Sequence, residues 1–107
     1  MSEPGGERSS AEHPPDEAPV VRVLQICNKK GLHARASAKF VQTVEKFDAE
    51  VKVKRGNEVV GGTSIMGLMM LSAGPGTTIT VEASGRDAAS VVDALAALVS
   101  GRFTEEE

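Results

Sequence analysis

The sequence predicts an α+β fold, an open-faced β-sandwich in which a four-stranded antiparallel sheet carries three helices on one face. Some segments are rich in β-branched residues or alternate apolar and polar side chains, as strands do, whereas others repeat apolar residues at helical spacing. These segments follow one another in the order β-α-β-β-α-β-α. Every predicted strand except the first has one polar face, so helices on a single side of an antiparallel sheet are the most economical arrangement.

The 107 residues divide into one small domain and two acidic ends. Residues 1–19 hold four of the five prolines, and five acidic side chains against a single arginine. Such a segment cannot bury enough apolar surface to offset the entropy lost on ordering, so we expect a disordered leader. Residues 105–107 are all glutamate and form an acidic tail. The folded domain is therefore expected over residues 20–104, which as a group are mildly basic.

Composition and patterning exclude several classes of protein. No run approaches the roughly 18 apolar residues that a membrane span needs, and no export signal is recognisable. The single cysteine cannot form an internal disulfide, and without a His/Cys cluster no metal site is expected. The lack of Trp and Tyr argues against a stacking surface for nucleic acid. We expect a cytoplasmic monomer that needs no cofactor and binds neither nucleic acid nor membranes.

The first predicted elements are a strand and an amphipathic helix. Residues 20–27 (VVRVLQIC) are apolar and β-branched, which favours a strand, and residues 28–31 (NKKG) form a turn signal. From Ala34 onward, apolar residues recur at intervals of three and four, with polar residues on the opposite side. This spacing predicts a helix that ends near Phe47.

A hairpin and a short helix follow. Residues 50–54 alternate with a period of two, and residues 59–60 form a short partner strand after a turn at 55–58. Ser64 is a favoured N-cap residue, which predicts that a short helix begins at Ile65 and continues to Leu71.

The last two elements are another strand and another helix. Residues 77–83 alternate again, and residues 84–87 (SGRD) open the final helix. Its apolar side is formed by Ala88, Val91, Val92, Leu95, Leu98 and Val99, with Phe103 near its end.

His33 is the one histidine of the predicted domain, and it lies at the first turn of the first helix. Unpaired backbone N–H groups and the helix dipole favour an anion there and disfavour imidazolium. A neutral imidazole nitrogen is a competent nucleophile, and Arg35 could hold phosphoryl oxygens. From spacing alone, a histidine that merely caps or packs at the helix end remains the simpler alternative. His13, in the leader, is expected to be incidental.

The short helix is a candidate docking surface. No polar side chain occurs from Ile65 to Leu71, and a helix this short buries about one face, which Leu68 and Leu71 would fill. Ile65, Met66, Met69 and Met70 should then be partly exposed and adaptable in their contacts. Two alternatives stay open: the whole helix is buried, and Ser64 is only its cap.

Residues 28–35 (NKKGLHAR) and 62–67 (GTSIMG) resemble the two signature sites of the HPr family, the histidine-containing phosphocarriers of the bacterial phosphoenolpyruvate-dependent phosphotransferase system. The resemblance covers residues 20–104, and the order of elements matches. It implies that enzyme I phosphorylates the pros ring nitrogen of His33, with Arg35 as an anion-binding neighbour. It also implies that Ser64 matches a serine modified by an HPr kinase/phosphorylase. The implied partner-binding residues are Ala38, Ile65, Met66, Met69 and Met70.

The resemblance implies a carrier protein, with no enzymatic turnover of its own, that passes the phosphoryl group from His33 to an EIIA-type protein. The sequence leaves open whether it serves the sugar or the nitrogen-related branch. A regulatory adaptor of the same fold, acting through Ser64 and the apolar surface without phosphoryl transfer, is the alternative. One residue departs from the family pattern: Ala36 stands where proline is usual, which concerns the rigidity of the site more than its chemistry.

Overall fold

The computed structural model describes residues 19–104, so nearly all of the predicted leader and the whole acidic tail lie outside the described residues. The predicted order of strands and helices is confirmed. The elements are β1 (Val20–Gln25), α1 (Ala34–Glu45), β2 (Glu50–Arg55), β3 (Glu58–Gly61), α2 (Ile65–Met70), β4 (Thr78–Ser84), α3 (Ala88–Ser100) and a 3₁₀ turn, η1 (Arg102–Thr104).

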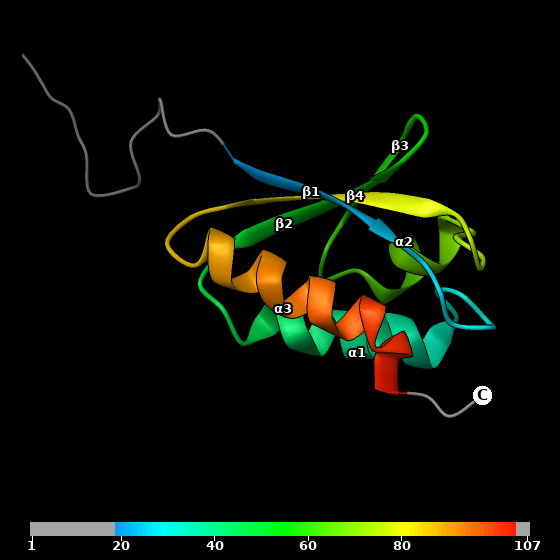
Figure 1. The fold of residues 1–107 in the computed structure, drawn as a ribbon. Helices are drawn as coiled ribbons and strands as arrows, with labels where there is room; N and C mark the ends of the chain where they lie inside the picture. The colour runs from blue at the N-terminus through cyan, green and yellow to red at the C-terminus, as the bar shows by residue number, and fades with distance from the viewer. Residues whose placement is uncertain (1–18, 105–107) are drawn as a thin grey trace, which may run out of the picture.

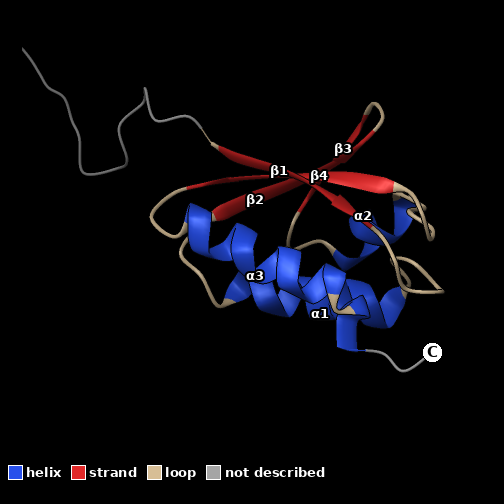
Figure 2. Ribbon diagram, in the orientation of Figure 1, coloured by secondary structure: helices blue, strands red, loops and turns tan. Residues whose placement is uncertain are grey.

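The four strands form one antiparallel sheet in the order β1-β4-β2-β3. Figure 1 and Figure 2 show the helices together on one side of this sheet, which leaves its other face open, as predicted. The open face carries Val23 opposite Thr80 and Lys54 opposite Val59, whereas the covered face pairs residues such as Val53 and Val81.

The core lies between the covered face and the three helices. Helix α1 buries its apolar side, as its spacing predicts, and it contacts both α2 and α3. The buried Ser37 hydroxyl donates to the backbone oxygen of Leu32 at 3.2 Å, so this polar group is satisfied inside the core. The largest fully buried side chains are Phe40, Phe103, Ile26, Leu68, Leu71, Ile79, Leu95, Val53, Val81, Val91, Val92 and Val99.

The chain leaves the sheet earlier than the sequence predicts at the end of β1. Paired strand geometry stops at Gln25, two residues before Cys27, because the chain from Ile26 onward faces a loop instead of β4. Ile26 still donates to Thr77 O and accepts from Gly76 N, both at 2.8 Å. Within residues 19–104, no helix is long and apolar enough to cross a membrane.

Candidate functional site

His33 is the N-cap residue of α1, immediately before its first helical residue. The imidazole Nδ1 accepts a hydrogen bond from the backbone N–H of Arg35 at 3.2 Å, and His33 O accepts from Ser37 N at 2.8 Å. An accepting Nδ1 carries no proton, so the neutral ring has its proton on Nε2. The side chain is half-buried, and its unprotonated nitrogen points at the positive end of the helix.

The loop that carries His33 is fixed by a contact with the segment after α2. Gly31 has φ +64°, and a Cβ there would lie 2.2 Å from Ala73 O, so no other residue fits without movement. Leu32 N donates to the same Ala73 oxygen at 3.0 Å, and Asn28 Nδ2 donates to Gly31 O at 2.9 Å. The sequence predicts a turn here, but the contact with Ala73 was missed because nothing local indicates it.

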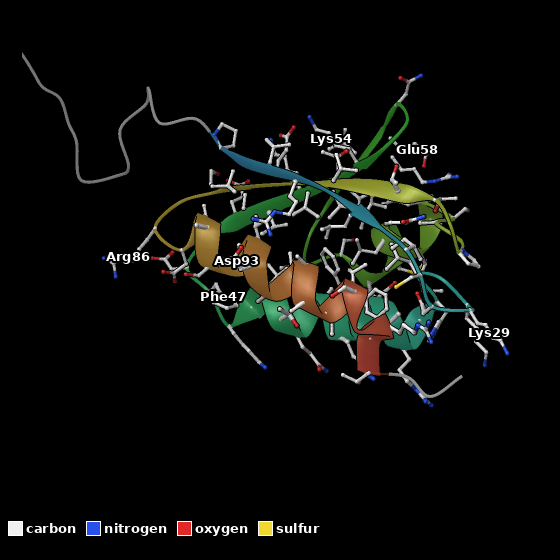
Figure 3. The ribbon with its side chains drawn as sticks, in the orientation of Figure 1. Lys29, Phe47, Lys54, Glu58, Arg86 and Asp93 are labelled. Atoms are coloured by element: carbon white, nitrogen blue, oxygen red, sulfur yellow. The ribbon has the colours of Figure 1, made fainter. Side chains whose placement is uncertain are left out.

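Positive charge gathers at this end of the molecule. Lys29 and Lys30 lie exposed in the loop before His33, Arg35 is exposed in the first turn of α1, and that turn contains no acidic residue. Figure 3 shows Lys29 pointing outward from the tip of the loop. Together with the N–H groups of the helix terminus, these cations favour binding of an anion next to Nδ1.

Ser64 is the N-cap residue of α2, and its Oγ accepts a hydrogen bond from Gly67 N at 3.0 Å. The prediction that Ser64 caps this helix is confirmed. The residue is exposed, so capping does not remove its hydroxyl from solvent. Gly67 allows this geometry, because a Cβ there would lie 2.9 Å from Ser64 Oγ.

The outer surface of α2 is apolar and accessible. Leu68 and Leu71 fill the core at 0% and 1% exposure, whereas Ile65 and Met69 are 40% exposed and Met66 and Met70 are 70% exposed. The alternative of a fully buried helix is therefore wrong. We call the four exposed residues Ile65, Met66, Met69 and Met70 the α2 patch.

Two further residues lie on elements that contact α2 or its end. Ala38, on the neighbouring helix α1, is half-buried. Arg55, at the end of β2, donates from Nη1 to Leu71 O at 3.1 Å and so caps the C-terminus of α2. The sequence pattern predicts Arg55 in a hairpin turn and gives no sign of this contact, because Leu71 is distant in sequence.

The structure relates the His33 and Ser64 sites through α2. The C-terminal end of α2 leads to Ala73, which contacts the His33 loop, whereas Ser64 lies at the other end of the helix. The two sites are therefore separated by the length of α2, and the α2 patch lies between them.

Comparisons with known proteins agree with this architecture. The family model for the PTS HPr component phosphorylation site matches residues 20–101. The chain is 51% identical over 84 residues to the phosphocarrier protein HPr of Neisseria meningitidis, covering 78% of this chain and 94% of that protein. It is 44% identical over 84 residues to the phosphocarrier protein NPr of Shewanella violacea, covering 78% and 92% of the two chains.

A solved structure shows the same fold. The crystal structure of HPr-C-His from Thermoanaerobacter tengcongensis superposes with a TM-score of 0.78 at 39% sequence identity, covering 82% of this chain and 99% of that one. The match spans the whole described arrangement of sheet and helices. The chain belongs to the HPr family of phosphocarrier proteins of the phosphotransferase system.

Proposed function

We propose that this chain is a cytoplasmic phosphocarrier that accepts a phosphoryl group from phosphorylated enzyme I on Nδ1 of His33 and passes it to an EIIA-type protein. The observation that carries the proposal is the orientation of His33, whose unprotonated Nδ1 faces the N-terminus of α1. The Nδ1 lone pair attacks phosphorus, a P–N bond forms, and the bond to the donor breaks with its electron pair leaving on the donor. Transfer to the acceptor reverses these roles.

The first turn of α1 stabilises the phosphorylated form. Once Nδ1 carries phosphorus it can no longer accept from Arg35 N–H, which becomes available to the phosphoryl oxygens one bond further out. The helix dipole favours the dianion, and the Arg35 guanidinium can add charge-assisted hydrogen bonds. Arg35 is exposed at this helix terminus, so a transfer partner would meet these groups at the surface of the molecule.

The test is phosphorylation with purified enzyme I and phosphoenolpyruvate. We expect an acid-labile, base-stable phosphate on the wild-type chain, complete loss of it in His33→Ala, and an unchanged circular dichroism spectrum in that variant. His13→Ala, which removes the other histidine of the chain, is the matched control and should accept phosphate normally. A His33→Ala protein that is still phosphorylated at the wild-type rate would overturn the proposal. A wild-type chain that accepts no phosphate from enzyme I, but is phosphorylated on Ser64 by an HPr kinase/phosphorylase, would favour the adaptor alternative.

Arg35 is expected to assist transfer without being essential to it. Loss of one charge-assisted hydrogen bond costs about 1.5–3 kcal/mol, so Arg35→Ala should slow phosphorylation by roughly tenfold to a hundredfold. The backbone N–H groups of the helix remain as anion ligands and prevent complete loss. Lys46→Ala, which removes a cation from the C-terminal end of the same helix, should leave the rate unchanged. Equal rates for the two variants would show that Arg35 is only a surface charge.

We also propose that phosphorylation of Ser64, by a kinase of the HPr kinase/phosphorylase type, slows acceptance of phosphate by His33. The new charge would lie at the edge of the α2 patch and would have to be desolvated when enzyme I docks. Ser64→Asp should reduce the transfer rate about tenfold at moderate salt. Ser64→Asn, which is also a good N-cap but neutral, should transfer at nearly the wild-type rate. If Ser64→Asp and Ser64→Asn accept phosphate at the same rate, or if either variant loses helical signal in circular dichroism, the charge is not the cause of slower transfer.

A further inference from the structure

Three of the four methionines of the chain lie on the six residues of α2. None of them fills a core position, because Leu68 and Leu71 anchor the helix. Met66 and Met70 are the most exposed large apolar side chains of the described residues, and Met69 is less exposed. The surface therefore presents thioether sulfurs where a leucine or isoleucine would be equally apolar and chemically inert.

Exposed thioethers react with hydroperoxides. The sulfur lone pair attacks one peroxide oxygen, an S–O bond forms and the O–O bond breaks, and hydrogen peroxide leaves as one molecule of water. Sulfur is oxidised by two electrons and the peroxide is reduced by two. The product, methionine sulfoxide, is polar and is reduced again by methionine sulfoxide reductases.

We propose that Met66 and Met70, with Met69 as a slower third position, form a reversible oxidation site through which peroxide weakens partner docking to the α2 patch. The inference rests on the proposed function, because it assumes that enzyme I docks on this patch. Each sulfoxide oxygen is a strong acceptor that an apolar contact leaves unsatisfied, so docking of the oxidised protein loses affinity. We expect the fold to keep its stability, since none of the three methionines belongs to the buried core.

Cys27 is the competing target for peroxide, since it is exposed and near the same end of the molecule as the His33 loop. Its Sγ lies 3.3 Å from Val99 O, toward which the thiol donates. The experiment is therefore carried out in a Cys27→Ser background, in which a hydroxyl can donate to the same carbonyl. This removes the thiol without touching α2.

The first measurement is the order of oxidation. Full-length Cys27→Ser protein is treated with hydrogen peroxide, and tandem mass spectrometry follows each methionine. Met66 and Met70 should gain oxygen before Met69. If Met69 is oxidised first, the greater exposure of Met66 and Met70 does not determine the site of oxidation, and the proposed site is wrong.

The second measurement is transfer from phosphorylated enzyme I before and after peroxide. We expect the KM of enzyme I for this protein to rise about tenfold or more after peroxide, with little change in kcat. The melting curve should be unchanged, and the original KM should return after treatment with both classes of methionine sulfoxide reductase. The matched control carries Met66→Leu, Met69→Leu and Met70→Leu as well, and its KM should be the same before and after peroxide. An unchanged KM in the fully oxidised protein, or an equal rise in the leucine control, would overturn the proposal.

A direct binding assay with enzyme I separates this inference from the proposed function. If the untreated protein binds enzyme I without accepting phosphate, the carrier function fails, and the effect of oxidation on the dissociation constant still decides the inference. If the untreated protein does not bind at all, both fail.

Discussion

Gly31 sets the path of the chain into α1, because two separate constraints meet at this residue. Its φ of +64° lies in the left-handed region, and its missing side chain lets the backbone approach Ala73. The same contact allows Leu32 N–H to reach Ala73 O, which places His33 directly at the helix terminus. The position of the proposed nucleophile thus depends on a residue that has no side chain.

Gly31→Ala should therefore destabilise the fold more than a strained φ alone would. Gly56 provides the matched control, since its φ is +61° and nothing lies within 4 Å of the Cβ that alanine would add. We expect Gly56→Ala to cost about 1 kcal/mol and Gly31→Ala to cost about 2 kcal/mol or more, measured by urea unfolding. Gly31→Ala should also slow phosphorylation of His33, whereas Gly56→Ala should not. Equal losses of stability would mean that the close approach to Ala73 relaxes at no cost.

Helix α2 is held by its two ends and by two leucines. Six residues are too few for an isolated helix to be stable in water, so tertiary contacts must hold it in place. Ser64 satisfies an N–H group at one end, Arg55 satisfies a carbonyl at the other, and Leu68 and Leu71 are buried beneath it. The α2 patch is consequently exposed on a helix whose position is fixed from below and from both ends.

Arg55→Ala should loosen α2 at its C-terminal end. The lost hydrogen bond comes from a charged donor but is only partly buried, so we expect a loss of about 1 kcal/mol in the free energy of unfolding. Faster hydrogen exchange should appear at the amides of α2 and of Ala73. Lys52→Ala, which removes an exposed cation from the same strand, is the control and should change neither quantity. Exchange that is equally slow in both variants would show that the leucines alone hold the helix.

The molecule as a whole concentrates its candidate sites at one end of the helical layer. The His33 loop is far in sequence from α2 and from Ala73, and the fold brings the loop and this segment together beside α1 (Figure 1). On the opposite edge of the fold, Asp87 N donates to Asp48 O at 2.9 Å and Asp48 N donates to Asp87 Oδ2 at 2.7 Å. This reciprocal pair joins the start of α3 to the loop after α1.

The predicted leader is acidic and rich in proline, a composition that cannot bury much apolar surface, so we expect it to add nothing to stability. A chain that starts at Pro19 after an initiating methionine should melt within about 4 °C of the full chain, since surface changes stay within about 0.5 kcal/mol. Its rate of phosphorylation by enzyme I at physiological salt should also be unchanged. A fall in the melting temperature of about 8 °C or more would show that residues 1–18 pack on the domain.

Local patterns determined most of the elements and the candidate residues. Alternation with a period of two identified β2 and β4, helical spacing identified α1 and α3, and the capping preference of serine identified the start of α2. These signals are local, because each depends on side chains within a few residues of one another. The roles assigned to His33 and Ser64 came from the resemblance of two short motifs, since spacing alone did not exclude ordinary helix caps.

Only the tertiary structure shows which segments distant in sequence contact one another. The strand order β1-β4-β2-β3, the close approach of Gly31 to Ala73 and the bond from Arg55 to Leu71 O all join residues that no local pattern relates. Phe103 is the clearest example of a position that such distant contacts decide. The sequence placed it near the end of the last helix, but α3 ends at Ser100, and Phe103 takes a φ of +56° to bury its ring. Lys39 Nζ on α1 donates to Phe103 O at 2.6 Å, a contact that requires α1 to lie beside the end of α3.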